Sequence, residues 1–174
     1  MADGLVVPPR QGRKLRTSAQ EVTFKVTGHE SRFASSFEVV VPPGFDVGAH
    51  VHSESEELFY VLDGELELLA FEPVERTAGN WQEWRSSTGQ RTFRAGPGSL
   101  VFVPPGCPHA FANRSHTEAR MFFQSSPPSR HERYFEELVD ILSGQGAADT
   151  EAVEELRRRY DIEQLTPLRF SPTT

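Results

Sequence analysis

Three histidines and one glutamate are spaced so that their side chains can meet at one point. His50 and His52 are two residues apart, so on a strand both imidazoles point to the same face. Glu57 lies five residues beyond His52, an odd offset, so residues 53–56 must bend the chain before Glu57 can face the same interior. His109 follows Gly106, which permits a sharp turn of the backbone. Three neutral imidazoles and one carboxylate form a donor set for a divalent transition metal.

This donor set predicts one metal ion held by His50, His52, Glu57 and His109. Nitrogen and oxygen donors without thiolate suit iron, nickel, manganese, cobalt, copper or zinc, and the spacing does not choose among them. A six-coordinate ion with four protein ligands has two open positions, one for substrate and one for dioxygen or water. The ion would keep a net positive charge, attract an anionic enolate, phenolate or carboxylate, and act as a Lewis acid. The alternative is a barrel whose histidines are hydrogen-bonded core residues and hold no metal.

Other residues of the same types are weaker candidates for the site. Glu56 could replace Glu57, but the in-out alternation that follows favours Glu57. Cys107, the single cysteine, lies on the turn before His109 and is expected to be a turn residue rather than a ligand. The histidines predicted to be solvated on the surface are His29, His116 and His131.

The elements that must position these side chains are short strands with a period of two. Turns rich in glycine and proline separate them, which favours an all-β sandwich or barrel. The predicted strands are 22–26, 37–41, 57–62, 65–71, 99–104, 109–113 and 118–124. Asp63-Gly64 predicts a tight hairpin because the turn needs a positive φ. In the irregular segment 72–97, we expect an added hairpin with arms 81–85 and 91–94. It carries Trp81 and Trp84 and would serve as a packing flap, a lid or a subunit contact.

The end of the sequence changes to a helical pattern. Ser129 and Glu132 form a capping box. One apolar stripe follows at helical spacing, made of Phe135, Leu138, Val139 and Leu142. Gly144 is expected to end this helix, and Asp149 to cap a second one with an apolar face of Val153, Leu156 and Tyr160. We expect both helices to cover the barrel rather than to belong to a site.

Length and composition indicate one globular domain of 174 residues. We divide it into a flexible arm (1–20), a barrel (21–126) and a helical tail packed on the barrel (127–174). The formal charge of −7 argues against a nucleic-acid partner, which needs a basic surface. A single cysteine excludes an internal disulfide, and no signal peptide or membrane-length apolar run is visible, so a cytoplasmic protein without a membrane partner is expected.

Both sequence motifs resemble those of the cupin superfamily. Residues 44–64 read G-x5-H-x-H-x4-E-x6-G, and residues 98–113 read G-x5-P-x-G-x2-H-x3-N. The resemblance implies a jelly-roll β-barrel with a metal in its mouth.

The runs EELFYVLDGE (56–65) and PPGCPHAF (104–111), with FEEL at 135–138, are similar to quercetin dioxygenase-like monocupins. That similarity implies a dioxygenase for a small aromatic or enolisable substrate, in which Glu57 also accepts the substrate hydroxyl proton. The alternatives are a metal-dependent isomerase, cyclase or lyase of a biosynthetic intermediate, and a non-catalytic metal-binding or ligand-binding cupin.

The two faces of the strands suggest a pocket and a subunit contact. Residues on the metal face are expected to line an apolar pocket for an aromatic substrate: Phe37, Val39, Phe59, Val61 and Phe111. Leu58, Tyr60 and Leu62 alternate with them and are apolar too. A strand that is apolar on both sides is covered on both sides, here by the tail helices or by a second subunit. A homodimer is expected.

Overall fold

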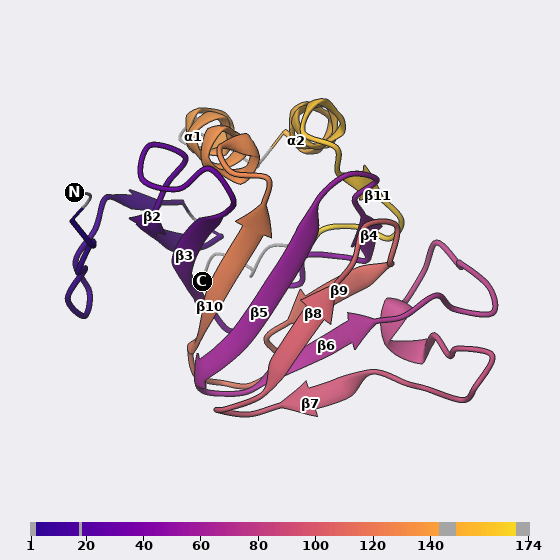
Figure 1. Cartoon of the computed structure of the whole chain (residues 1–174). Helices are drawn as coiled ribbons and strands as arrows, with labels where there is room; N and C mark the ends of the chain where they lie inside the picture. Colours follow the sequence, from indigo (N-terminus) through magenta and orange to yellow (C-terminus); the bar gives the residue numbers. More distant parts are fainter. Residues whose placement is uncertain (1–2, 18, 143–148, 170–174) are drawn as a thin grey trace.

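Short antiparallel strands form most of the molecule (Figure 1). The computed structural model describes residues 3–17, 19–142 and 149–169. Its strands are β1 (Lys14–Arg16), β2 (Glu21–Val26), β3 (Ser35–Val41), β4 (His50–Val51), β5 (Glu56–Asp63), β6 (Leu66–Ala70), β7 (Phe93–Ala95), β8 (Leu100–Val103), β9 (His109–Ala112), β10 (Ala119–Ser126) and β11 (Glu163–Gln164). The helices are α1 (Arg130–Leu142) and α2 (Thr150–Arg159), with a 3₁₀ turn η1 (Trp81–Glu83). The predicted all-β jelly roll with two C-terminal helices is confirmed.

The strands form two facing sheets. One has the order β1-β2-β3-β10-β5-β8, and the other has the order β11-β4-β9-β6-β7. All the pairings are antiparallel. β1 belongs to the first 20 residues, where a loose arm is expected, and it pairs with β2. Inward residues of both sheets interdigitate to form the core, which is the usual solution for two packed sheets.

The predicted bend between His52 and Glu57 is present, and it moves the chain from one sheet to the other. β4 lies in the second sheet and β5 in the first. The Asp161 carboxylate accepts hydrogen bonds from the backbone N–H groups of Ser53 (3.1 Å) and Glu54 (2.9 Å), which holds the bend. After it Glu57 is buried and Glu56 is exposed, so Glu57 faces the interior, as the alternation predicts.

Gly64 forms the predicted turn, but the strands on either side of it do not pair. Its φ is +74°, and a Cβ at this position would lie 2.8 Å from the Ala119 Cα and from the Glu118 carbonyl oxygen. β5 and β6 belong to different sheets, so the hairpin prediction is wrong. A turn signal reports the local φ angle, whereas the sheet that a strand joins depends on tertiary packing.

The irregular segment between β6 and β7 is a packed flap. Trp81 and Trp84 are both buried. The Trp81 indole Nε1 donates to Asp46 Oδ1 at 2.8 Å, and the Trp84 indole donates to the Thr77 hydroxyl at 2.9 Å. The expected hairpin arms are wrong, because Trp81–Glu83 is a 3₁₀ turn and β7 pairs with β6. The packing interpretation of the two tryptophans is confirmed.

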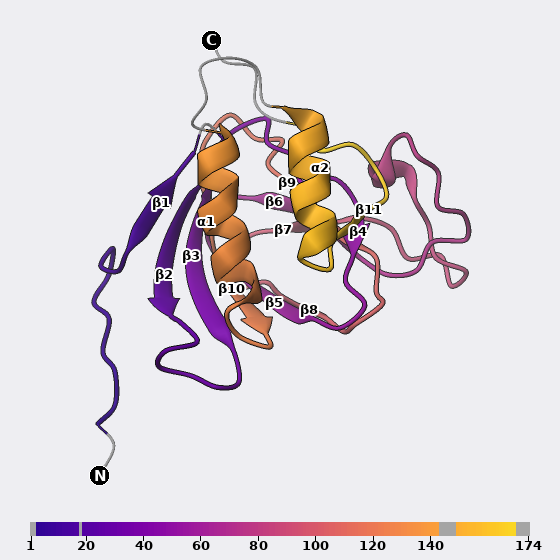
Figure 2. The same ribbon diagram turned by 90° about the horizontal axis from the view of Figure 1, so that it is seen from above.

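Both helices lie over the same end of the two sheets, side by side (Figures 1 and 2). α1 packs on the first sheet through Phe135, whose ring centroid lies 5.3 Å from that of Phe37. The Asp149 carboxylate caps α2 by accepting from the Ala152 N–H, as predicted. Gly144, expected to end the first helix, lies outside the described residues. After α2 the chain returns to the barrel, where β11 pairs with β4.

The helices leave the outer face of β5 and β8 uncovered. Leu58 lies opposite Phe102, and Tyr60 lies opposite both Leu100 and Phe122. Leu100 is 57% exposed and Phe102 is 52% exposed. Of the two covers expected for this apolar face, the tail helices are therefore excluded within the part of the chain that the structure describes.

Candidate metal centre

The fold brings together all four predicted donor residues. His50 on β4 lies opposite His109 on β9, and their ring centroids are 4.2 Å apart. His52 follows β4 directly, and Glu57 enters from β5 in the facing sheet. One donor atom from each residue lies within 4.8 Å of the others, and all four residues are buried. The cluster therefore has the size of a first coordination shell.

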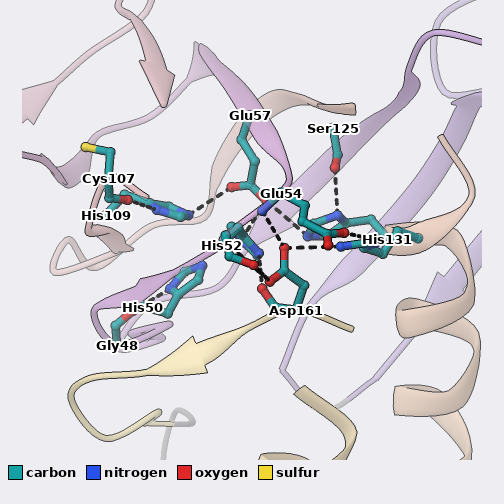
Figure 3. A network of polar contacts seen from close by, with 12 residues as sticks. Gly48, His50, His52, Glu54, Glu57, Cys107, His109, Ser125, His131 and Asp161 are labelled. Atoms are coloured by element: carbon teal, nitrogen blue, oxygen red, sulfur yellow. Dashed lines mark hydrogen bonds and ion pairs between the residues drawn. The ribbon is translucent and has the colours of Figure 1, made fainter. Parts of the chain in front are cut away.

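Backbone carbonyl groups orient the three imidazoles (Figure 3). The Nδ1 atoms of His50, His52 and His109 lie 2.9, 2.8 and 3.0 Å from the carbonyl oxygens of Gly48, Asp161 and Cys107. A carbonyl only accepts, so each Nδ1 must carry the proton. In the neutral rings the lone pair is then on Nε2, the atom that turns into the cluster. This is the tautomer that metal-binding histidines use.

The chemistry of the cluster fits a bound cation. His52 Nε2 and His109 Nε2 each lie 3.0 Å from an oxygen of Glu57, yet both nitrogens are buried without a hydrogen-bond partner among the described residues. Lone pairs and a carboxylate repel one another in a buried site unless a positive charge lies among them. A divalent metal ion would supply that charge, so the residues present fit a metal.

The pKa directions agree with this need. Burial lowers the pKa of His50 well below its usual range, and the neighbouring His109 imidazole lowers it further. Burial by itself would raise the pKa of Glu57, but His52 and His109 together hold it well below the usual range. Burial lowers the pKa of His52, but the Glu57 carboxylate raises it by more. The cluster thus favours a neutral His50, an ionised Glu57 and a positive charge beside that carboxylate, which a metal ion would supply in place of the proton.

A fourth histidine, His131 on α1, contacts the cluster. It is buried, so the prediction that it is a solvated surface residue is wrong, whereas His29 and His116 are exposed as expected. His131 Nε2 lies 3.0 Å from Glu57 Oε1, and Nδ1 lies 2.7 Å from the Ser125 hydroxyl. Burial lowers the pKa of His131, which favours its neutral form.

The tautomer of His131 is the opposite of that of the other three histidines. The Glu57 carboxylate only accepts, so His131 donates from Nε2 and accepts the Ser125 O–H at Nδ1. With its proton on Nε2, His131 fixes the position of Glu57 instead of offering a lone pair to the cluster. The sequence carried a signal for this burial, because His131 is four residues before Phe135 on the apolar stripe of α1.

The C-terminal tail therefore does more than cover the barrel. The Asp161 carbonyl orients His52, while its carboxylate holds the bend before Glu57. Arg130, the first residue of α1, binds the same carboxylate at 3.1 Å and Glu54 at 2.6 Å. The expectation that the tail lies outside the site is wrong, since these contacts connect both helices to the donor cluster.

A cavity of about 60 Å³ lies against the cluster and below the helices. Of the predicted pocket residues, Val39, Phe59 and Phe111 line it, while Phe37 and Val61 are buried in the core and do not. Its polar lining comes from His50, Glu57, His131, Tyr134 and Arg157, besides Gln20. No residue of the 71–92 flap lines this cavity, so the flap is not its lid.

Cys107 is half-buried, and burial raises the pKa of its thiol. The raised pKa disfavours the thiolate form, the form in which cysteine binds metals.

Two facing antiparallel sheets that enclose three histidines and one glutamate are typical of one class of small β-barrel proteins. The chain belongs to the cupin family, whose model, described as Cupin, matches residues 11–143.

Among relatives, an uncharacterized protein from Methanocaldococcus jannaschii is 26% identical over 95 residues, which are 55% of this chain and 62% of that protein. The chain thus spans about three fifths of the length of this relative. Among the described residues, neither helix combines the length and the apolarity that crossing a bilayer requires.

Solved structures share the fold at low sequence identity. The polyketide cyclase RemF from Streptomyces resistomycificus is 20% identical, with a TM-score of 0.53 and coverage of 71% of this chain and 79% of that one. A predicted oxalate decarboxylase from Thermotoga maritima is 17% identical, with a TM-score of 0.53 and coverage of 70% and 97%. Ectoine synthase from P. lautus is 15% identical, with a TM-score of 0.52 and coverage of 71% and 75%. These similarities show the fold alone.

Proposed function

We propose that this protein is a metal-dependent enzyme that acts on a small enolisable substrate, with His50, His52, Glu57 and His109 as the metal ligands. One observation carries the proposal: the Nδ1 atom of each of the three histidines contacts a backbone carbonyl oxygen. These contacts leave the three Nε2 atoms facing one buried carboxylate. A bound divalent ion would supply Lewis acid chemistry and stabilise an anionic form of the substrate.

The residues of the chain divide the remaining work. Glu57 is the candidate catalytic base, since it is held ionised beside the cavity and can accept a proton from a substrate hydroxyl group. His131 keeps this carboxylate in place through Oε1. Val39, Phe59 and Phe111 form an apolar wall that keeps bulk water away from the anion so formed.

The size of the cavity bears on the kind of reaction. A quercetinase-like dioxygenase is supported by the similarity of the motifs and by a donor set that suits iron and nickel. An apolar cavity known to bind benzene has a volume of about 150 Å³, however, so a flavonol would enter this cavity of about 60 Å³ only if the helices move. The volume therefore favours a second candidate, a non-oxidative isomerase, cyclase or lyase of a smaller substrate.

Oxygen uptake separates these candidates. We expect protein purified without a metal-binding tag to contain close to one transition metal ion per chain. A dioxygenase should consume oxygen together with a small enol or hydroxyaromatic compound, and removal of the metal should stop the reaction. Conversion without oxygen uptake would identify the non-oxidative enzyme. Ligand retention without any turnover would contradict both and indicate a binding protein.

We also propose that the protein is a homodimer through the outer face of β5 and β8. The patch is apolar, includes the edge strand β8 and can pair with its own copy about a two-fold axis. We expect light scattering to give the mass of two chains for the wild type and of one chain for the double variant L100K/F102K. A wild-type mass of one chain would reject the dimer, and Val74→Lys, at another exposed apolar residue, is the matched control.

A further inference from the structure

One buried cation that lines the cavity has no hydrogen-bond or ion-pair partner among the described residues. Arg157 on α2 is 2% exposed and lines the cavity together with His50, Glu57 and Tyr134. No hydrogen bond or ion pair forms at its guanidinium among the described residues, and its Nε atom is buried without any acceptor. Arg158 and Arg159, the next residues, are exposed and pair with Glu155 and Glu137 at 2.7 and 2.8 Å. The helix thus offers partners to its surface arginines and none to the arginine that points inward.

A buried arginine without an anion is costly. Burial lowers the pKa of Arg157, but a guanidinium remains charged in proteins. Moving an unpaired charge out of water costs several kcal/mol, so buried charges are normally paired. The cost persists here in a cavity with an apolar wall of Val39, Phe59 and Phe111. A protein keeps such an unpaired charge when another part of the fold depends on the side chain or when a bound ligand supplies the missing anion.

The charge balance of the cavity favours a ligand. Among the residues that line the cavity, Arg157 carries a positive charge and Glu57 carries a negative one. A divalent metal would add two positive charges. Because Glu57 belongs to the donor set, a metal ion would use its charge, and Arg157 would still need an anion from a ligand.

We propose that Arg157 is the anion-binding residue of this cavity and that the substrate of the protein is a small organic carboxylate, bound between Arg157 and the metal centre. The fork of the guanidinium matches the two oxygens of a carboxylate. Tyr134 lines the same cavity, and its hydroxyl group can donate to the same carboxylate. A cavity of about 60 Å³ admits a short carboxylic acid and excludes a large aromatic acid in this conformation. The inference rests on the proposed metal centre and adds the chemical class of its substrate.

A titration of zinc-loaded protein with acetate tests this, because acetamide offers a neutral ligand of the same size. We expect acetate to bind more tightly than acetamide to the wild type and its affinity to fall at least about tenfold in Arg157→Met, the loss expected for one charge-assisted contact. Arg157→Lys should keep part of the affinity, and Arg158→Met, the matched surface control, should keep all of it. Equal acetate affinity in wild type and Arg157→Met would overturn the inference, as would Arg157-dependent binding of inorganic phosphate without binding of acetate.

The melting temperature separates a binding role from a structural one. Zinc-loaded Arg157→Met should melt at or above the wild-type temperature, because methionine keeps the apolar stem and removes the buried charge. A fall of more than about 5 °C would mark Arg157 as a structural residue and overturn the inference. The metal content is measured first. Absence of zinc from the wild type would reject the metal centre, whereas full zinc with acetate binding that ignores Arg157 would reject only the carboxylate site.

Discussion

His50→Ala and His109→Ala are each expected to abolish stoichiometric metal binding while the barrel stays folded. The two rings lie opposite each other across β4 and β9, and each supplies one of the four donors. Loss of a residue that only supports a ligand weakens metal affinity about 10-fold to 100-fold, so loss of a ligand should exceed about 100-fold. Elemental analysis of purified protein and competition with a chelator measure the effect.

The barrel should survive these changes because its core does not depend on the cluster. Phe123 on β10 stacks on Phe37 of β3 and on Phe59 of β5. None of the four donors takes part in these contacts. Circular dichroism should therefore show unchanged strand content. His116→Ala, at an exposed histidine, is the matched control and should keep its metal. One firmly bound metal ion per chain in either site variant would reject the assignment of the ligands.

His131→Leu is expected to lower metal affinity about 10-fold to 100-fold, although His131 is not itself a ligand. The imidazole donates to Glu57 Oε1 at 3.0 Å and is itself oriented by Ser125. Leucine fills a similar volume but leaves the buried carboxylate without this donor. The carboxylate can then rotate, and a ligand that is no longer held in one position binds less tightly. Chelator competition on wild type and variant, at the same pH, gives the ratio.

Two further variants identify the cause of that loss. His131→Gln restores an N–H donor and should recover part of the affinity, whereas a purely steric effect would not be recovered. Ser125→Ala removes only the group that orients the imidazole and should have a smaller effect. His29→Leu, at an exposed histidine, should have none. Wild-type affinity in His131→Leu would show that Glu57 is held without His131.

Much of the barrel and the donor cluster follows from local rules. A period of two places His50 with His52, and Glu57 with Phe59, on buried faces, because alternate side chains of a strand share one face. The same rule identified Glu57 rather than Glu56. The odd offset after His52 required a bend, and the structure has one. Helical spacing located α1 and α2, and Asp149 was correctly predicted to cap the second helix.

Local rules failed wherever the answer depended on which elements pack together. Asp63-Gly64 determined a turn, yet the turn joins two sheets rather than two paired strands. Trp81 was predicted on a hairpin arm, but its indole bonds to Asp46, far away in the sequence, which stabilises a 3₁₀ turn.

The sequence by itself determined that three imidazoles and one carboxylate would lie inside a β-barrel, because strand periodicity and turn chemistry act over a few residues. Only the tertiary structure decided that His131, Arg157 and Asp161 would join them. These residues come from a tail that docks through the packing of Phe135 and the pairing of β11 with β4. Helical spacing predicts that His131 is buried, but its contact with Glu57 depends on the docking of surfaces that are far apart in the chain, which no local pattern describes.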